Sequence, residues 1–283
     1  MVDVDFANSI VSYIGYRSFY NNKITTVTFN KYLKSVETQA FYSNSISSVN
    51  LTASTNLVYI SSGAFSTNKL TSLDLSGCSK LTYIYGDTTY GGAFHSNLIK
   101  TLKLGNIPLS SFGTYSFYGN SITELDLSGL SQLVSIGTQA FYSNSITNLT
   151  LSPKLTAIEA GAFIYNKLKS VDFTVSPYLA YINGDNSPYG GAFESNTLTS
   201  VKFGGASSRI TWFGTKAFYN NYITSLDLSN MPYLVSIGYY SFYVNDIANL
   251  TLSPKLTAIE PGAFRSNNLK LSLIHISEPT RPY

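Results

Sequence analysis

A phenylalanine followed three residues later by an asparagine recurs eleven times in this chain of 283 residues, and this pattern constrains the fold most strongly. Successive phenylalanines are 22 to 30 residues apart, so the chain is built from short repeats rather than from domains with separate cores. The repeated phenylalanines are Phe19, Phe41, Phe65, Phe94, Phe117, Phe141, Phe163, Phe193, Phe218, Phe242 and Phe264.

Each asparagine is followed by apolar residues with the spacing of a short strand. In one repeat these residues are Ile122, Leu125 and Leu127, and the alternation at the last two indicates a strand with one buried face. The segment from Ile136 to Phe141 then returns along the opposite side and closes a coil. We therefore expect a mainly β solenoid of about ten repeats, with one short parallel strand per repeat.

The phenylalanine and the asparagine each have a structural explanation. A single coil cannot bury its own apolar residues, so each phenylalanine is covered by its equivalents above and below, and truncating one to alanine should cost about 3 to 5 kcal/mol. The asparagine amide can pair with backbone groups at an internal turn, where each unpaired group would cost about 1 to 3 kcal/mol. Both residues should form ladders along the stack.

A longer repeat is superimposed on the coils. Residues Leu125 to Asn166 resemble Leu226 to Asn267 at an offset of 101 positions, so four coils form one module. The coil resembles the BspA-like class of leucine-rich repeats, with a signature similar to L-x-x-I-G-x-x-A-F-x-x-C/N-x-x-L-x-x-L-x-L, from Val4 to Lys270. Many members carry cysteine where this chain has asparagine, so a cysteine ladder is excluded. The resemblance implies surface or secreted proteins of bacteria and some protists, often adhesins that hold host proteins or other cells.

Both ends of the chain depart from the repeat. Residues 271–283 resemble a translated sequencing-library adapter, so we expect a solenoid over residues 1–270 and a non-native tail over 271–283, with a short capping strand as the alternative. The N-terminal residues align with the middle of a coil and carry no secretion signal. We therefore expect a fragment of a longer protein, incomplete at both ends.

Composition disfavours several kinds of function. The net charge is only +3, basic residues form no runs, and no apolar segment is long enough to insert into a membrane, so we expect neither a nucleic-acid partner nor membrane insertion. Cys78 is the single cysteine, and His95, the only histidine before the tail, follows Phe94 at a variable position that predicts surface exposure. We expect no catalytic residue, no metal site and no cofactor.

Charged residues recur between the two strand leucines. Each lysine there should lie about 4.8 Å from an aspartate on either side, which would neutralise like charges along a concave face. An open ladder lacks the apolar pocket of a catalytic carboxylate pair, so the residues either form solvated charge pairs or contact a ligand. The candidate binding residues of this ladder are Asp74, Lys103, Asp126, Asp172, Lys202 and Asp227.

Two loop insertions, over residues 85–92 and 183–191, occupy matching positions in successive modules. Insertions in solenoids often carry recognition, although the glycines here also suit plain turns. Calcium binding is poorly supported, because the ion needs several oxygen ligands close together. A ligand that exploits the module should touch both loop tyrosines, about 20 Å apart. The candidate binding residues are Asp87, Tyr90, Asp185 and Tyr189.

Tyrosines directly follow many of the repeated phenylalanines. If the phenylalanine points inward its neighbour points outward, which predicts a line of surface rings suited to recognition. Packing against the edge of the next coil is the alternative that the sequence leaves open. These tyrosines are Tyr20, Tyr42, Tyr118, Tyr142, Tyr219 and Tyr243.

These features favour a non-enzymatic binding solenoid at the cell surface or outside the cell. It should recognise a host or neighbouring-cell protein or glycan through its concave face, its tyrosines or its loops. A passive spacer that holds a missing functional domain away from the cell surface is the alternative. A glycan-processing enzyme is a third, less favoured class.

Overall fold

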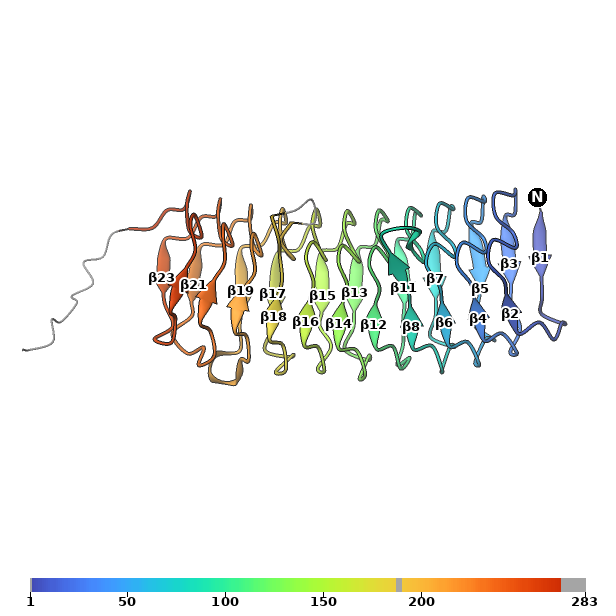
Figure 1. The fold of residues 1–283 in the computed structure, drawn as a ribbon, viewed down its shortest axis with the longest axis horizontal. Helices are drawn as coiled ribbons and strands as arrows, with labels where there is room; N and C mark the ends of the chain where they lie inside the picture. The colour runs from blue at the N-terminus through green and yellow to red at the C-terminus, as the bar shows by residue number, and fades with distance from the viewer. Residues whose placement is uncertain (1, 187–189, 271–283) are drawn as a thin grey trace, which may run out of the picture.

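The computed structural model describes residues 2–186 and 190–270, which form one elongated solenoid (Figure 1). The coils follow one another in a nearly straight row in this view, without the deep curvature that the expected concave face implied. The solenoid predicted from the repeated phenylalanines is confirmed. Tyr189 and the expected tail over 271–283 lie outside the described residues.

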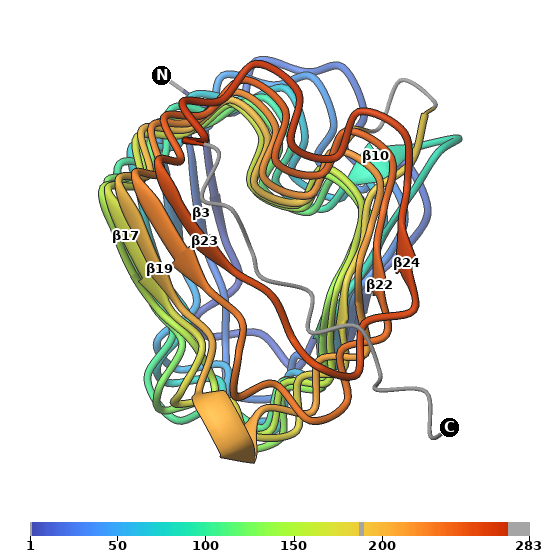
Figure 2. The same ribbon diagram turned by 90° about the vertical axis from the view of Figure 1, so that its left-hand side faces the viewer.

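Two sets of short strands lie on opposite sides of the coils (Figure 2). The strand predicted after each asparagine is three residues long, and its middle residue faces the core while its neighbours face outward, as in the pattern of Leu125. Each of these strands pairs in parallel with a strand of a neighbouring coil, but together they divide into one three-stranded and four two-stranded sheets. They are β1 (Asp3–Asp5), β3 (Thr26–Thr28), β5 (Ser48–Asn50), β7 (Ser72–Asp74), β11 (Thr101–Lys103), β13 (Glu124–Asp126), β15 (Asn148–Thr150), β17 (Ser170–Asp172), β19 (Ser200–Lys202), β21 (Ser225–Asp227) and β23 (Asn249–Thr251).

A second set of strands, each two residues long, was not predicted from the sequence. These strands form one continuous parallel sheet of eleven strands, in which Ile136 pairs in register with Ile158 of the next coil. Two residues are too few to show a period of two, which is why the pattern was missed. They are β2 (Tyr13–Ile14), β4 (Ser35–Val36), β6 (Tyr59–Ile60), β8 (Tyr83–Ile84), β12 (Ser111–Phe112), β14 (Ser135–Ile136), β16 (Ala157–Ile158), β18 (Tyr181–Ile182), β20 (Trp212–Phe213), β22 (Ser236–Ile237) and β24 (Ala258–Ile259).

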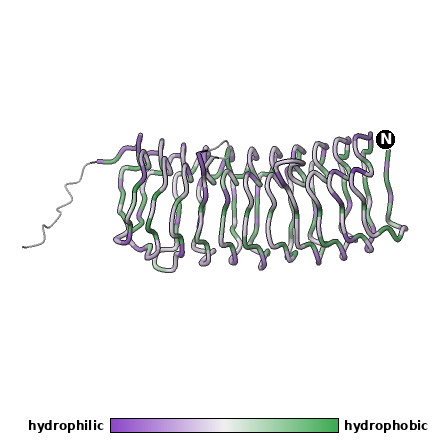
Figure 3. The backbone as a smooth tube through the Cα atoms, in the orientation of Figure 1, coloured by the Kyte–Doolittle hydropathy of each residue, from purple (hydrophilic) through white to green (hydrophobic). Residues whose placement is uncertain are grey.

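Apolar segments recur at matching places in every coil and meet inside the solenoid (Figure 3). The phenylalanines stack as a column, with ring centroids 5.2 Å apart for Phe41 and Phe65 and 5.5 Å apart for Phe117 and Phe141. Nine of the eleven are fully buried. Phe19 and Phe264, at the two ends of the column, are only partly buried, because fewer coils cover them.

The asparagine ladder ties each coil to the preceding one. The amide nitrogen of Asn120 donates to the carbonyl of Phe117 in its own coil at 3.1 Å and to that of Phe94 in the preceding coil at 3.0 Å. Its side-chain oxygen accepts the N–H of Ile99 at 3.0 Å. Among the described residues, the side chain of Asn22, in the first complete coil, bonds a single partner, the carbonyl of Tyr20. The predicted hydrogen bonding inside the coil is confirmed.

Two elements depart from the coil. An antiparallel hairpin, β9 (Gly86–Asp87) and β10 (Gly91–Gly92), projects beyond the outline of the stack in Figure 2, and a 3-10 turn, η1 (Gly205–Ser207), lies between β19 and β20. Within the described residues, no helix has the length and apolar character needed to cross a membrane.

Candidate functional site

Hairpin β9–β10 is the first of the two predicted loops, and its turn is organised by Asp87. The Oδ1 atom of Asp87 accepts the backbone N–H groups of Thr89 at 2.8 Å and Tyr90 at 2.7 Å. Burial raises the pKa of the carboxyl, but these N–H groups and the Ser62 hydroxyl outweigh it, so the pKa lies below its usual value. Asp87 is thus a structural residue of the turn.

The hairpin folds back over coils that precede it in the chain. The ring of Tyr90 makes an edge contact with the ring of Tyr16, with centroids 6.5 Å apart. Its carbonyl oxygen lies so close to Gly63 that a Cβ there would be only 2.6 Å away. Gly63 also has a φ of 65°, which favours glycine. The hairpin therefore occupies a defined place against the stack.

The residues that directly follow the repeated phenylalanines form a column along the outside of the solenoid, here called the outer column. Tyr118 stacks on Tyr142 with ring centroids 4.7 Å apart, and His95 stacks on Tyr118 at 5.2 Å. Tyr20 and Tyr42 stack at 5.1 Å. Apart from the exposed Tyr20 at the end of the stack, each tyrosine is half-buried and still has an outward edge, which combines the two interpretations that the sequence left open.

Ser66 interrupts the outer column between Tyr42 and His95. Its hydroxyl lies 3.0 Å from Nδ1 of His95. Burial lowers the pKa of His95, so the imidazole is neutral at pH 7. The sequence predicted a surface position for His95, but its ring is half-buried because Tyr118 stacks on it and Gly91 of the hairpin lies close to it.

A groove of about 420 Å³ opens at this interruption, between the hairpin and the outer column. Its volume falls within the range of small-ligand sites, roughly 300 to 1,000 Å³. None of its lining residues is an aspartate, glutamate, lysine or arginine. The groove joins two predicted features, Tyr90 of the loop and the tyrosines of the column, and adds residues that the sequence did not single out. It is lined by Gln39, Tyr42, Ser66, Thr88, Thr89, Tyr90, Gly91, His95, Tyr115, Tyr118 and Gln139.

The second module differs at the matching positions. Ile164 stands where the first module has Ser66, and both side chains are almost fully buried, so the modules differ here in the size and polarity of the residue. Glu194 replaces His95, and its Oε2 atom accepts the N–H of Gly191 at 3.0 Å. Burial raises the pKa of Glu194. Asp185 lies at the start of this loop, where its N–H bonds the carbonyl of Gly190 at 3.3 Å.

The charged ladder is only partly as predicted. Lys103 pairs with Asp74 at 3.9 Å, and Lys202 pairs with Asp172 at 3.6 Å. The expected second partners, Asp126 and Asp227, form no ion pair within the described residues. The sheets explain this correction, because β11 pairs with β7 and β19 with β17, whereas β13 and β21 belong to other sheets.

The unpaired aspartates of the ladder serve their own turns. Asp126 and Asp227 accept the backbone N–H groups of Ser128 at 3.0 Å and Ser229 at 2.9 Å. The two ion pairs that do form, Lys103 with Asp74 and Lys202 with Asp172, are solvent-exposed, and such pairs contribute little, about 0 to 1 kcal/mol. The structure therefore brings no ladder residue into the groove.

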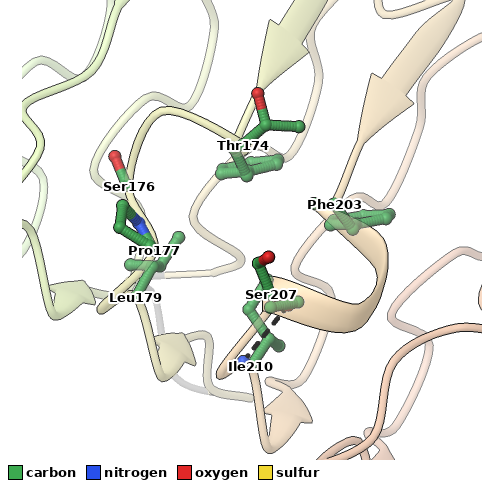
Figure 4. A pocket seen from close by; sticks show the side chains of 10 residues that line it. Thr174, Ser176, Pro177, Leu179, Phe203, Ser207 and Ile210 are labelled. Atoms are coloured by element: carbon green, nitrogen blue, oxygen red, sulfur yellow. Dashed lines mark hydrogen bonds between the residues drawn. The ribbon is translucent and has the colours of Figure 1, made fainter.

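Two further places have no room or chemistry for a reaction. A crevice of about 10 Å³ beside η1, lined by residues such as Thr174, Phe203 and Ser207, has space for no more than a single water (Figure 4). Cys78 is fully buried, and burial raises the pKa of its thiol to about 12, so it is not a nucleophile. No cluster of three or more potential metal ligands occurs in residues 2–186 and 190–270.

Comparisons with known proteins agree with this fold. The family model described as BspA type leucine rich repeat region matches residues 1–90, 88–184 and 189–280, with six copies. A leucine-rich-repeat protein from Bacteroides ovatus aligns at a TM-score of 0.50 and 17% identity, covering 94% of this chain and 72% of the other.

The functional domain of InlJ from Listeria monocytogenes, which includes a cysteine ladder, aligns at a TM-score of 0.48 and 21% identity over 84% of this chain. The present chain spans 55% of the length of that structure. A search of curated proteins gave no match.

Proposed function

Because the chain belongs to the BspA-type leucine-rich-repeat family, we propose that it is a non-enzymatic binding solenoid, displayed at a cell surface or secreted, that recognises a protein or glycan of a host or neighbouring cell. The groove under hairpin β9–β10 carries this proposal. It gathers rings, amides and hydroxyls from several coils on a rigid scaffold, so binding costs little ordering of the protein. A passive spacer needs only a stable core and a polar surface, and has no use for such a groove.

The test is a binding measurement against a panel of host-matrix proteins and surface glycans. The double variant Tyr90→Ala/Tyr118→Ala should weaken binding of a confirmed ligand at least tenfold, because it removes ring surface from both walls of the groove. Tyr233→Ala is the matched control, since Tyr233 is 58% exposed and does not line the groove. Unchanged affinity in the double variant would reject the groove as the site, and a wild-type chain that binds nothing would favour the spacer.

The matching loop of the second module supplies Tyr189, which extends the proposal to longer ligands. A ligand that follows the module should contact Tyr90 and Tyr189 together, across about 20 Å. Changing both tyrosines to alanine should then weaken binding more than either change alone. If the double variant binds as well as the wild type, the charged ladder around Asp126, Lys202 and Asp227 becomes the next surface to mutate.

A further inference from the structure

The groove lies where the outer column lacks a ring. Tyr42 and His95 are two coils apart, so their positions are separated by about 10 Å. Rings of neighbouring coils stack about half that distance apart, as the 4.7 Å between Tyr118 and Tyr142 shows. Within the described residues the only ring stacked on Tyr42 is that of Tyr20, on the opposite side from the interruption. Tyr42 therefore turns ring surface toward Ser66 and the groove.

The polar groups of the groove are uncharged. Gln39 is held in place because its Oε1 atom accepts the Arg17 guanidinium Nε–H at 2.7 Å, which presents its NH₂ group as a donor. Thr88 and Thr89 add hydroxyls, which can both donate and accept. The lining thus combines ring faces with donors and acceptors and contains no aspartate, glutamate, lysine or arginine to balance a charged ligand.

We infer that this groove, whose role in binding rests on the proposed function, takes an oligosaccharide of uncharged sugars. A sugar ring presents a face of C–H groups that packs on an aromatic ring, while its hydroxyls pair with amides and other hydroxyls. The lining residues extend from Gln39 to Gln139, four coil steps or about 20 Å, which suits several linked sugars rather than one.

The backbone around the groove argues against an extended peptide as the ligand. Peptides of that kind bind by adding a strand to an unpaired sheet edge. Of the lining residues only Gly91 belongs to a strand, and it already pairs with Asp87 in the hairpin. The walls are otherwise made of turns and side chains, so main-chain pairing has no strand edge to extend.

The second module provides a natural comparison within the same chain. Ile164, in place of Ser66, fills the equivalent interruption so closely that a Cβ on Gly190 would lie 2.8 Å from its Cδ1. Glu194 and Lys216 stand where the first module has His95 and Tyr115, so the matching surface is charged. The small residue at the interruption and the uncharged residues at positions 95 and 115 are therefore specific to the first module, whereas Tyr142 and Tyr219 match Tyr42 and Tyr118.

The experiment uses Ser66→Ile, which places the residue of the second module in the first. Wild-type protein is titrated calorimetrically with neutral hexasaccharides of glucose, mannose, galactose and xylose, and with a hyaluronan hexasaccharide as the charged counterpart. At least one neutral hexasaccharide should bind, and Ser66→Ile should weaken its binding at least tenfold. Tyr233→Ala, at an exposed position that does not line the groove, should retain affinity within about threefold. Thermal unfolding of each variant identifies any that fails to fold, in which case Tyr42→Ala, which removes the ring surface, replaces it.

The outcomes separate this inference from the proposed function. In one outcome the wild type attaches to cells or matrix and Ser66→Ile does not, yet no neutral hexasaccharide binds or competes. That result would overturn the sugar inference and leave the groove as the site of another ligand. Preference for hyaluronan over the neutral sugars would overturn it as well. If Ser66→Ile and Tyr90→Ala/Tyr118→Ala both attach normally, the groove is not the site and the proposed function fails with it.

Discussion

The side-chain amide of Asn144 donates a hydrogen bond to the carbonyl oxygen of Phe117, 3.0 Å away in the preceding coil. The same amide bonds the carbonyl of Phe141 in its own coil, and its oxygen accepts the N–H of Ile122. One buried side chain thus satisfies backbone groups of two coils. Successive coils of the stack are therefore joined by this ladder as well as by the phenylalanine column.

Asn144→Ala should lower the free energy of unfolding by at least about 2 kcal/mol, because each backbone group left unpaired in the interior costs about 1 to 3 kcal/mol. Denaturant unfolding followed by circular dichroism measures the change. Asn22→Ala is the matched control and should cost less than about 1 kcal/mol, since the Asn22 side chain makes a single bond within the part of the chain that the structure describes, to the carbonyl of Tyr20. Equal losses at the two positions would contradict the ladder.

Gly63→Ala should displace the hairpin, because the new Cβ would meet the carbonyl oxygen of Tyr90 at 2.6 Å. Gly119→Ala is a close control, since Gly119 has nearly the same φ, 64° against 65°, but its nearest neighbour to a Cβ is a Ser96 hydroxyl at 3.8 Å. Both substitutions therefore impose similar backbone strain, whereas only Gly63→Ala adds a clash with the carbonyl of Tyr90. Limited proteolysis should cut the hairpin faster in Gly63→Ala alone. Equal cutting would mean that the hairpin does not depend on this contact.

The sequence predicts the coil well because the coil repeats. Away from the ends of the stack, each phenylalanine and asparagine occupies the same environment, so one physical explanation serves all of them. It does not predict where the hairpin folds, since the contact of Tyr90 with Gly63 occurs once and joins neighbouring coils. The interruption at Ser66 leaves a trace in the sequence, because Ile164 occupies the matching place in the second module. The difference between Ser66 and Ile164 can be interpreted only when the structure shows that the residues of the outer column stack on one another.

Lys202→Ala should change the free energy of unfolding by less than about 1 kcal/mol, because its pair with Asp172 is solvent-exposed. Asp172→Ala should cost more, since the Oδ1 atom of Asp172 also accepts the N–H of Thr174 at 2.9 Å and its hydroxyl at 2.6 Å. Denaturant titrations at low and high salt compare the two variants. A larger loss for Lys202→Ala than for Asp172→Ala would show that the ion pair, not the turn, is the main contribution.

His95 should make stability depend on pH in a defined direction. Burial lowers its folded-state pKa below the ordinary 6.5, so between these two values the unfolded chain binds more protons than the folded chain. Stability contributed by the neutral imidazole is therefore fully present above about pH 6.5 and decreases as the pH falls toward the folded-state pKa.

His95→Asn removes this titration, so its melting temperature should fall less than that of the wild type between pH 7.5 and pH 5.5. Glu194 responds in the opposite sense, because burial raises its pKa and the folded chain then binds more protons as the pH falls. Glu194→Gln should accordingly lose more stability than the wild type as the pH falls from the folded-state pKa of Glu194 toward the ordinary 4.5, so the melting curves extend to pH 4.5. If the melting temperatures of all three proteins change equally with pH, neither the His95 nor the Glu194 side chain is desolvated in the folded protein.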